Sequence, residues 1–341
     1  KLRGERFTAQ FRPVLIRCKG CGKRFTPVLD ALELEDGQGS TDMLLKKAVE
    51  AVAETSYRRG SDQLEALTAA PVPKSTAHRW TASVDLPTEE HEAERYLSAD
   101  GTGFKRQPGQ RGEIRLVAGI DQKGRIRPVG VWAGTSWEDI SKEVDRRMEG
   151  EAELFISDGE RAIQEWFAGL AKRTGRCLWH FPRESYHALW EDDAPSAERQ
   201  ETRKKLKEIV AIEIPEEDVE MVSEEDKEEI GRKIQNAQQE VKKLRDEFEE
   251  KGYEKIVTYL DRARDKLFSH LRLWQQTGIV GMRTTSIVEN IIRELVRRLK
   301  KVGWNWSEEG AARMGRIVMI RRHDKKRWEK HWKERINLRG R

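Results

Sequence analysis

The sequence of 341 residues is poor in cysteine and contains no long apolar segment. Its three cysteines exclude a disulfide-stabilised scaffold and fit a reducing compartment, so we expect a cytoplasmic protein. No apolar run approaches the roughly 18 residues that a membrane-spanning helix needs, and no hydrophobic secretory segment opens the chain. We therefore expect no membrane partner. The chain opens at Lys1 without a Met, so we expect the natural protein to begin earlier.

Charge is abundant but segregated along the chain. Charged residues make up 37% of the sequence, against roughly a quarter in ordinary globular proteins. Residues 1–30 hold eight Lys or Arg against two acids, and residues 281–341 hold eighteen against seven. The intervening residues 181–280 hold eighteen against twenty-five. Basic ends predict a polyanion partner, most commonly nucleic acid, and solvated helix faces are the alternative interpretation.

The first 35 residues resemble half of a zinc ribbon. Short β-branched runs flank Cys18 and Cys21, which form one C-x-x-C knuckle. A complete ribbon supplies four thiolates to a tetrahedral Zn²⁺, so this interpretation requires a second knuckle from the missing start of the chain. The alternative is a turn whose cysteines simply pack.

Residues 36–93 predict a helix-turn-helix region followed by a linker over 84–93. Apolar spacing predicts a helix over 42–54, a second helix over 61–67, and a third over 74–80 after a proline-containing turn. The third helix would present its polar residues to DNA: Lys74, Ser75, Thr76, His78 and Arg79. A helical hairpin without a DNA function is the alternative.

Residues 94–180 predict the first part of an α/β core. We expect strands over 95–105, 114–121 and 125–132, and then a helix over 137–148, a strand over 153–158, a helix over 160–172 and a strand over 176–180. Three antiparallel strands followed by alternating helices and strands is the order of an RNase H-like mixed sheet with helices on both faces.

Two further segments complete the predicted organisation. Residues 181–280 are acidic and amphipathic, and we interpret them as a large α-helical insertion. Residues 281–341 would supply the closing helix of the core, beginning near Ser286, and a basic C-terminal segment. Five cationic residues of that segment are candidate DNA contacts: Arg293, Arg297, Lys300, Arg321 and Arg322. The tryptophans among them could stack on unpaired bases or pack internally.

Three acidic residues are candidate metal ligands. Asp100 interrupts the first predicted strand, Asp158 ends the strand LFIS, and Glu289 lies early in the closing helix. Such carboxylates can hold two Mg²⁺ ions, which polarise a phosphodiester and activate a water or a 3′-hydroxyl. Each acid has a structural alternative, because Asp-Gly pairs favour turns and Ser286-x-x-Glu289 has capping-box spacing.

Cys177 and His180 form a C-x-x-H pair soon after the second acid. The pair could be half of a metal site, a nucleophile with its base, or a packed cysteine beside a satisfied histidine.

The strings SADGTGFKR, FISDGERAI, CLWH and TTSIVENIIRELVRRLKKVGWNWSEEGAARM resemble a DDE transposase, and specifically the Mutator-like insertion-sequence transposases that carry a C-x-x-H motif. The resemblance covers roughly residues 95–322. It implies that Asp100, Asp158 and Glu289 hold two Mg²⁺ or Mn²⁺ ions and that His180 contacts phosphate or supports the acids. It also implies that the protein binds element ends and target DNA, as a homo-oligomer in the synaptic complex.

Two rival functions remain open. One is an RNase H-like nuclease that cleaves DNA without strand transfer, and the other is a catalytically retired DNA-binding regulator.

Overall fold

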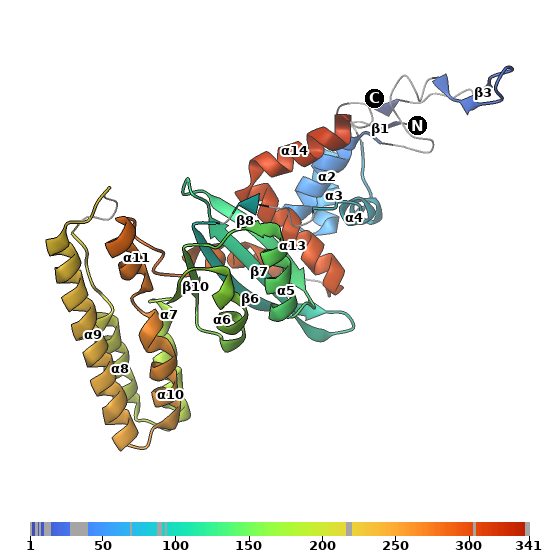
Figure 1. Cartoon of the computed structure of the whole chain (residues 1–341). Helices are drawn as coiled ribbons and strands as arrows, with labels where there is room; N and C mark the ends of the chain where they lie inside the picture. Colours follow the sequence, from blue (N-terminus) through green and yellow to red (C-terminus); the bar gives the residue numbers. More distant parts are fainter. Residues whose placement is uncertain are drawn as a thin grey trace. The chain divides into compact units, whose positions relative to one another are not determined.

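The computed structural model describes residues 2–3, 6, 8–9, 15–27, 40–68, 70–86, 91–92, 94–215, 220–302 and 305–337 (Figure 1). Internal contacts divide the chain into two units. Unit 1 comprises Lys1–Pro87, Thr102–Ile114 and Arg293–Arg341, and unit 2 comprises Thr88–Gly101 and Arg115–Ile292.

Unit 2 is built around a mixed sheet with the strand order β11-β10-β6-β7-β8. Its strands are β6 (Tyr96–Arg106), β7 (Gln110–Ile120), β8 (Ile126–Ala133), β10 (Leu154–Ser157) and β11 (Thr174–Arg176), and the ends of β6 and β7 nearest their connection belong to unit 1. The connections 107–109 and 121–125 are too short for a crossover, so β6, β7 and β8 are antiparallel. Strands β10 and β11 run parallel to β6. The predicted mixed α/β sheet is therefore confirmed.

Apolar side chains of alternating strand residues form the core on one face of this sheet. Leu97 and Ala99 of β6 and Phe155 of β10 pack there against α5 (Trp137–Arg147) and α6 (Arg161–Phe167). On β6, the alternate residue Tyr96 packs instead with Leu154 and with Leu273 of α11. The remaining short elements of this part are β5 (His91–Glu92), β9 (Met148–Glu149) and the 3₁₀ turn η1 (Ala168–Leu170).

Residues 180–277 form a helical group with an apolar core of its own. Figure 1 shows its elements, which are α7 (His180–Glu191), α8 (Ser196–Ile209), α9 (Glu224–Glu250), α10 (Glu254–Ala263), η2 (Arg264–Lys266) and α11 (Ser269–Thr277). Ser223 caps α9 by accepting a hydrogen bond from the Asp226 N–H, and three acids in the first turn favour the positive end of the helix dipole. Helix α12 (Ser286–Val296) follows, as predicted for the closing helix.

Unit 1 contains the hairpins β1 (Leu2–Arg3) with β2 (Thr8–Ala9) and β3 (Ile16–Arg17) with β4 (Arg24–Phe25). Its helices are α2 (Asp42–Glu54), α3 (Tyr57–Leu67), α4 (Lys74–Ala82), the π-helical turn η3 (Arg297–Lys301), α13 (Glu308–His323) and α14 (Lys325–Asn337). Helices α2, α3 and α4 pack on one another, and α13 and α14 both contact α2.

Two predictions about these elements were wrong in detail. The strand expected over 176–180 is β11 at 174–176, because the Phe181 N–H bonds to the Cys177 carbonyl and turns the chain into α7. The helix expected over 160–172 ends earlier, because the Lys172 N–H bonds to the Ala152 carbonyl in extended backbone. Of the two roles considered for the tryptophans of the basic segment, Trp328 and Trp332 have the internal one, because both are buried in unit 1 and pack edge to face.

No helix in the described part of the chain combines the length and the apolar character that crossing a bilayer requires.

Candidate metal and phosphodiester site

The register of the parallel strands places Asp100, Asp158 and Cys177 at neighbouring positions. Ile156 of β10 lies opposite Ser98 of β6. Asp158 comes two residues after Ile156, and Asp100 comes two residues after Ser98, so the two acids lie at equivalent positions along the paired strands. Cys177 directly follows β11, and its N–H donates to the Ser157 carbonyl at 2.9 Å. The carboxyl edge of a sheet is where open α/β folds bind ligands.

A hydrogen bond joins the two segments that carry His180 and Glu289. The Leu178 N–H donates to the Arg283 carbonyl at 2.9 Å, directly before α7 begins at His180 and shortly before α12 begins at Ser286. Val288 and Ile291 are fully buried, which fixes the rotation of α12 in unit 2. The Glu289 carboxylate then lies beside His180.

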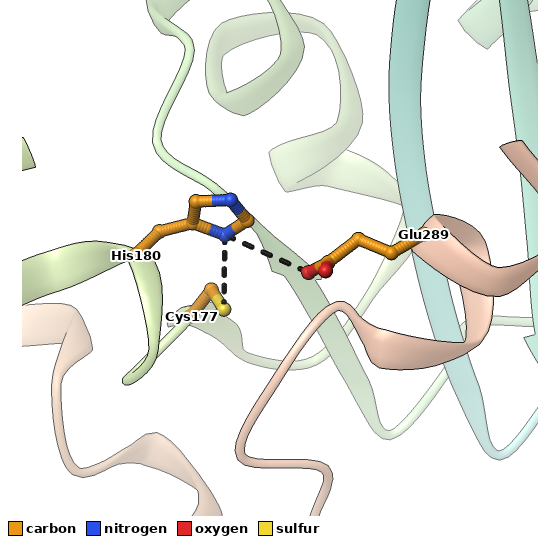
Figure 2. A group of neighbouring side chains, drawn as sticks. All are labelled: Cys177, His180 and Glu289. Carbon is orange, nitrogen blue, oxygen red and sulfur yellow. Dashed lines mark hydrogen bonds and ion pairs between the residues drawn. The ribbon is translucent and has the colours of Figure 1, made fainter. Parts of the chain in front are cut away.

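Figure 2 shows Cys177 and His180, from the segment that leads into α7, converging with Glu289 of α12. His180 Nδ1 lies 3.3 Å from Cys177 Sγ and 3.8 Å from Glu289 Oε1. The three potential ligand atoms all lie within 4.8 Å of one another, and they are the one group of this kind among the described residues.

Thr285 connects the members of this cluster. Its N–H and its hydroxyl both lie 3.4 Å from Cys177 Sγ, and its hydroxyl donates to Glu289 Oε1 at 2.7 Å. The capping-box interpretation of Ser286 was wrong, because Ser286 is the first helical residue and it is Thr285 that bonds to Glu289. The bond positions the Glu289 carboxylate beside His180.

The acids are coupled electrostatically. Burial, followed by the negative charge of Asp158, raises the pKa of Asp100 to about 7, and Glu289 adds to this rise while His180 opposes it. Although burial alone would lower the pKa of His180, the hydrogen bond with Cys177 and the charges of Glu289 and Asp158 raise it. These charges influence one another, but among the described residues Asp100 and Asp158 do not belong to the group of ligand atoms within 4.8 Å of one another, which consists of Cys177, His180 and Glu289.

The pKa of Cys177 is lowered, whereas burial raises the pKa of an ordinary thiol. Burial on its own raises the pKa of Cys177, but hydrogen bonds from His180 and Thr285 outweigh burial and lower the pKa. The sulfur is fully buried within the folded chain. It acts here as a hydrogen-bond acceptor that orients His180 and Thr285.

The turn interpretation of the two Asp-Gly pairs also has support. Asp158 Oδ1 accepts from the Glu160 N–H at 2.9 Å, and Asp100 Oδ1 accepts from the Gly101 N–H at 2.6 Å. Each carboxylate keeps a second oxygen, so a turn role and a ligand role are compatible.

The donor chemistry fits a divalent cation in two ways. Asp100, Asp158 and Glu289 supply the carboxylate oxygens that Mg²⁺ and Mn²⁺ prefer. Cys177, His180 and Glu289 form the tighter group, but their sulfur, nitrogen and oxygen atoms are of the type that Zn²⁺ accepts. Cys177 is already engaged by His180 and by the Thr285 N–H, whereas the acids repel one another, so the acids have more to gain from a bound cation.

Helix α4 exposes most of the residues predicted to contact DNA. Lys74, Ser75, His78 and Arg79 are exposed and Thr76 is half-buried, whereas Ala77 and Thr81 are buried. The exposed polar face and the buried apolar face fit the predicted use of this helix. His78 also packs edge to face on Tyr57, with ring centroids 5.1 Å apart.

Three predicted cationic contacts from the C-terminal segment converge on a single acid in unit 1. Arg297, Arg321 and Arg322 all form ion pairs with Glu54. Three cations around one carboxylate leave a surplus of positive charge. Arg293 is exposed, and Lys300 donates to the Thr102 hydroxyl at 2.9 Å.

Cys18 and Cys21 lie on the turn between β3 and β4. The Cys18 N–H donates to the Lys23 carbonyl at 2.8 Å, and Cys21 is exposed. Hydrogen bonds from Cys21, through its backbone and its side chain, lower the pKa of Cys18. Within the described ranges, no further potential ligand joins the two thiols in a group of three.

The sequence prediction missed two residues of the site. Thr285 precedes SIVE and carried no recognisable signal, because its partners lie on distant segments. Trp179 is 54% exposed beside His180, with ring centroids 4.8 Å apart, and its place inside the string CLWH could have marked it. Trp304, considered as a stacking residue, lies outside the described residues.

Comparison with known proteins leaves the geometry as the basis for assigning a function. No protein-family model matches the chain, and no curated protein sequence matches it significantly.

Proposed function

We propose that this chain is a DNA transposase that binds element ends, cleaves phosphodiester bonds and joins the 3′-hydroxyl end to target DNA. One observation supports the proposal most: Asp158 and Asp100 occupy neighbouring positions where β10 ends beside the middle of β6, and Glu289 lies 3.8 Å from His180 at the start of α7. In this proposal the sheet, α5, α6 and α12 form an RNase H-like core, and residues 180–277 are its helical insertion.

Asp100, Asp158 and Glu289 would hold two Mg²⁺ or Mn²⁺ ions. When bound, these ions polarise the phosphodiester and activate the attacking water or 3′-hydroxyl. His180 lies 3.8 Å from Glu289, and the raised pKa of its imidazole favours the protonated form, which would attract a phosphate bound beside it. Thr285 and Cys177 hold both side chains in place.

Unit 1 would bind DNA, with α4 as the recognition helix of a helix-turn-helix. Arg293, Arg297, Lys300, Arg321 and Arg322 would add contacts to phosphates. Cys18 and Cys21 would supply half of a zinc ribbon when a preceding knuckle is present. We further propose that the protein works in the cytoplasm on the nucleoid and forms a homo-oligomer when it joins two element ends.

The decisive experiment compares Glu289→Gln with Glu294→Gln on the same helix. Glu294 pairs with His323 and Arg322 in unit 1, so its substitution matches the charge change without touching the acids. An amide is a much poorer ligand for a hard cation than a carboxylate. We expect Glu289→Gln to keep its DNA affinity and melting temperature but to lose cleavage by about a hundredfold or more.

The measurement uses purified protein, DNA carrying the flanking inverted repeats, and Mg²⁺ or Mn²⁺. Near wild-type cleavage by folded Glu289→Gln would remove Glu289 from the site. Cleavage without a joined product would identify a nuclease, and DNA binding without cleavage by the unaltered chain would identify a regulator.

A further inference from the structure

Two adjoining hollows in unit 2 lie beside Asp158. The first, of about 660 Å³, is lined by Asp158, Gly159, Arg176, Tyr259 and Arg262 among others. The second, of about 430 Å³, shares Gly159 and Arg262 with the first and adds Lys266. Together they form a hollow that continues from a candidate metal ligand along α6 and α10.

Arg176 is a buried cation without a counter-ion. It ends β11 and is 5% exposed, and its guanidinium lies over the Tyr259 ring at 5.3 Å. Nη2 donates to the Tyr259 hydroxyl at 2.9 Å, but Nε finds no acceptor and no carboxylate pairs with Arg176 among the described residues. Burying an unpaired charge is costly, so the arrangement favours a bound anion.

Lys266 places a second cation in the same hollow. Its Nζ donates to Gln164 Oε1 at 2.6 Å, which aims the amine at the wall shared by the two hollows. Burial and then the positive charge of Arg176 lower the pKa of Lys266, which shows that the two cations are close enough to repel. An anion between them would turn this repulsion into attraction.

Gly159 has no side chain, which leaves room for the Arg176 guanidinium close to Asp158. Its φ of +99° lies in the region that favours glycine, and a Cβ atom there would coincide with Arg176 Nη1. Arg176 therefore lies directly against the backbone of the residue that follows Asp158. The first hollow also carries Glu160, Glu184 and Glu191, and the second carries Glu165 beside Arg161, so we place the anion between Arg176 and Lys266.

We propose that Arg176 and Lys266, with Arg262 at the rim, bind a backbone phosphate of DNA adjacent to the phosphodiester held at Asp158. This inference rests on the proposed function and adds a phosphate subsite to it. A planar guanidinium and an ammonium are the two side-chain groups that bind phosphate most readily. The subsite would fix the path of the strand past the acids.

The test measures binding of the full chain to a 30-base-pair duplex by fluorescence anisotropy over a range of NaCl concentrations. We expect Lys266→Gln and Arg176→Gln each to reduce the log–log salt slope by about 0.9 and to weaken binding about tenfold. Arg203→Gln on exposed α8 makes the same charge change and should leave both quantities unchanged. In Mg²⁺-dependent cleavage, Lys266→Gln should raise KM with little effect on kcat.

If Arg176→Gln fails to fold, the test rests on Lys266→Gln, because Lys266 is only half-buried and its substitution should leave the fold intact. An unchanged salt slope and KM for folded Lys266→Gln, in a chain that binds and cleaves DNA, would overturn the subsite alone. A second measurement uses inorganic phosphate in place of DNA. If phosphate raises the melting temperature of the unaltered chain but not of the Arg176 and Lys266 variants, and these variants bind DNA with unchanged affinity, the site binds free phosphate and the DNA assignment is wrong. Absence of DNA binding and cleavage by the unaltered chain would overturn both proposals.

Discussion

At the residue scale, one sulfur atom determines how the candidate site is arranged. Cys177 Sγ lies within hydrogen-bonding distance of His180 Nδ1 and of the N–H and hydroxyl of Thr285. Sulfur is a large and weak acceptor, so it tolerates several donors at distances that an oxygen would not allow. The consequence is that the start of α7 and the segment before α12 are joined through a single side chain.

Glu94 carries the clearest pH dependence outside the site. It is 2% exposed, and burial raises its pKa to about 7, although Arg127 at 3.8 Å opposes the rise. Because the folded state holds the proton more tightly, stability falls as the pH rises from about 4.5 to 7, and the loss is complete above pH 7. We expect Glu94→Gln to stabilise unit 2 by about 2 kcal/mol at pH 8 and by little near pH 4.5.

Thermal melting at pH 5 and pH 8 measures this effect. Glu151→Gln, at an exposed position, is the control and should leave the melting temperature unchanged at both pH values. If Glu94→Gln gained more stability at pH 5 than at pH 8, the sign of the pKa shift would be wrong.

At the scale of elements, α9 depends on one apolar stripe. Its buried residues recur every three or four positions: Ile230, Ile234, Ala237, Val241, Leu244 and Phe248. Isolated helices are marginal in water, so this stripe and its contacts with α8 and α10 stabilise the helix.

Leu244→Ala tests the importance of the stripe. Leu244 is 4% exposed, and truncating a buried leucine costs about 2–5 kcal/mol. We expect amide hydrogen exchange in α8, α9 and α10 to accelerate at least thirtyfold, since about 1.4 kcal/mol corresponds to a factor of ten. Exposed Lys242→Ala is the control, and equal exchange in the two variants would contradict the role of the stripe.

Local signals predicted α2 and the start of α12 well, because each has apolar residues at helical spacing over a full face. The residues 177–180 were assigned to a strand because CLWH is apolar and short, and periodicity cannot distinguish a strand from a turn there. Their actual conformation depends on the bond from the Leu178 N–H to the Arg283 carbonyl, a partner about a hundred residues later. Long-range bonds of this kind have no local signature, which is also why Thr285 was missed.

At the scale of the whole molecule, positive charge is concentrated in the terminal segments and negative charge in the helical group. The formal net charge is only +5, so the segregation matters more than the total. Electrostatic attraction should therefore direct DNA to unit 1, where α4 exposes Lys74 and Arg79.

The double variant Lys74→Gln/Arg79→Gln tests this distribution. If both side chains neutralise phosphates, the log–log salt slope of DNA binding should fall by about 1.8. Lys204→Gln/Lys207→Gln on α8 makes the same charge change at exposed positions of the acidic segment and should leave the slope unaltered. Equal losses in both double variants would mean that net charge alone governs binding.

The hydrogen bond between Leu178 and Arg283 joins two segments that are synthesised at different times. A ribosome releases Asp100, Asp158 and His180 more than a hundred residues before Glu289, and the helical group synthesised between His180 and Glu289 has an apolar core of its own. That core can fold while the sheet edge still lacks its last acid, because domains generally fold as units during synthesis. The set of three acids is therefore completed only after every residue of the helical group has been synthesised.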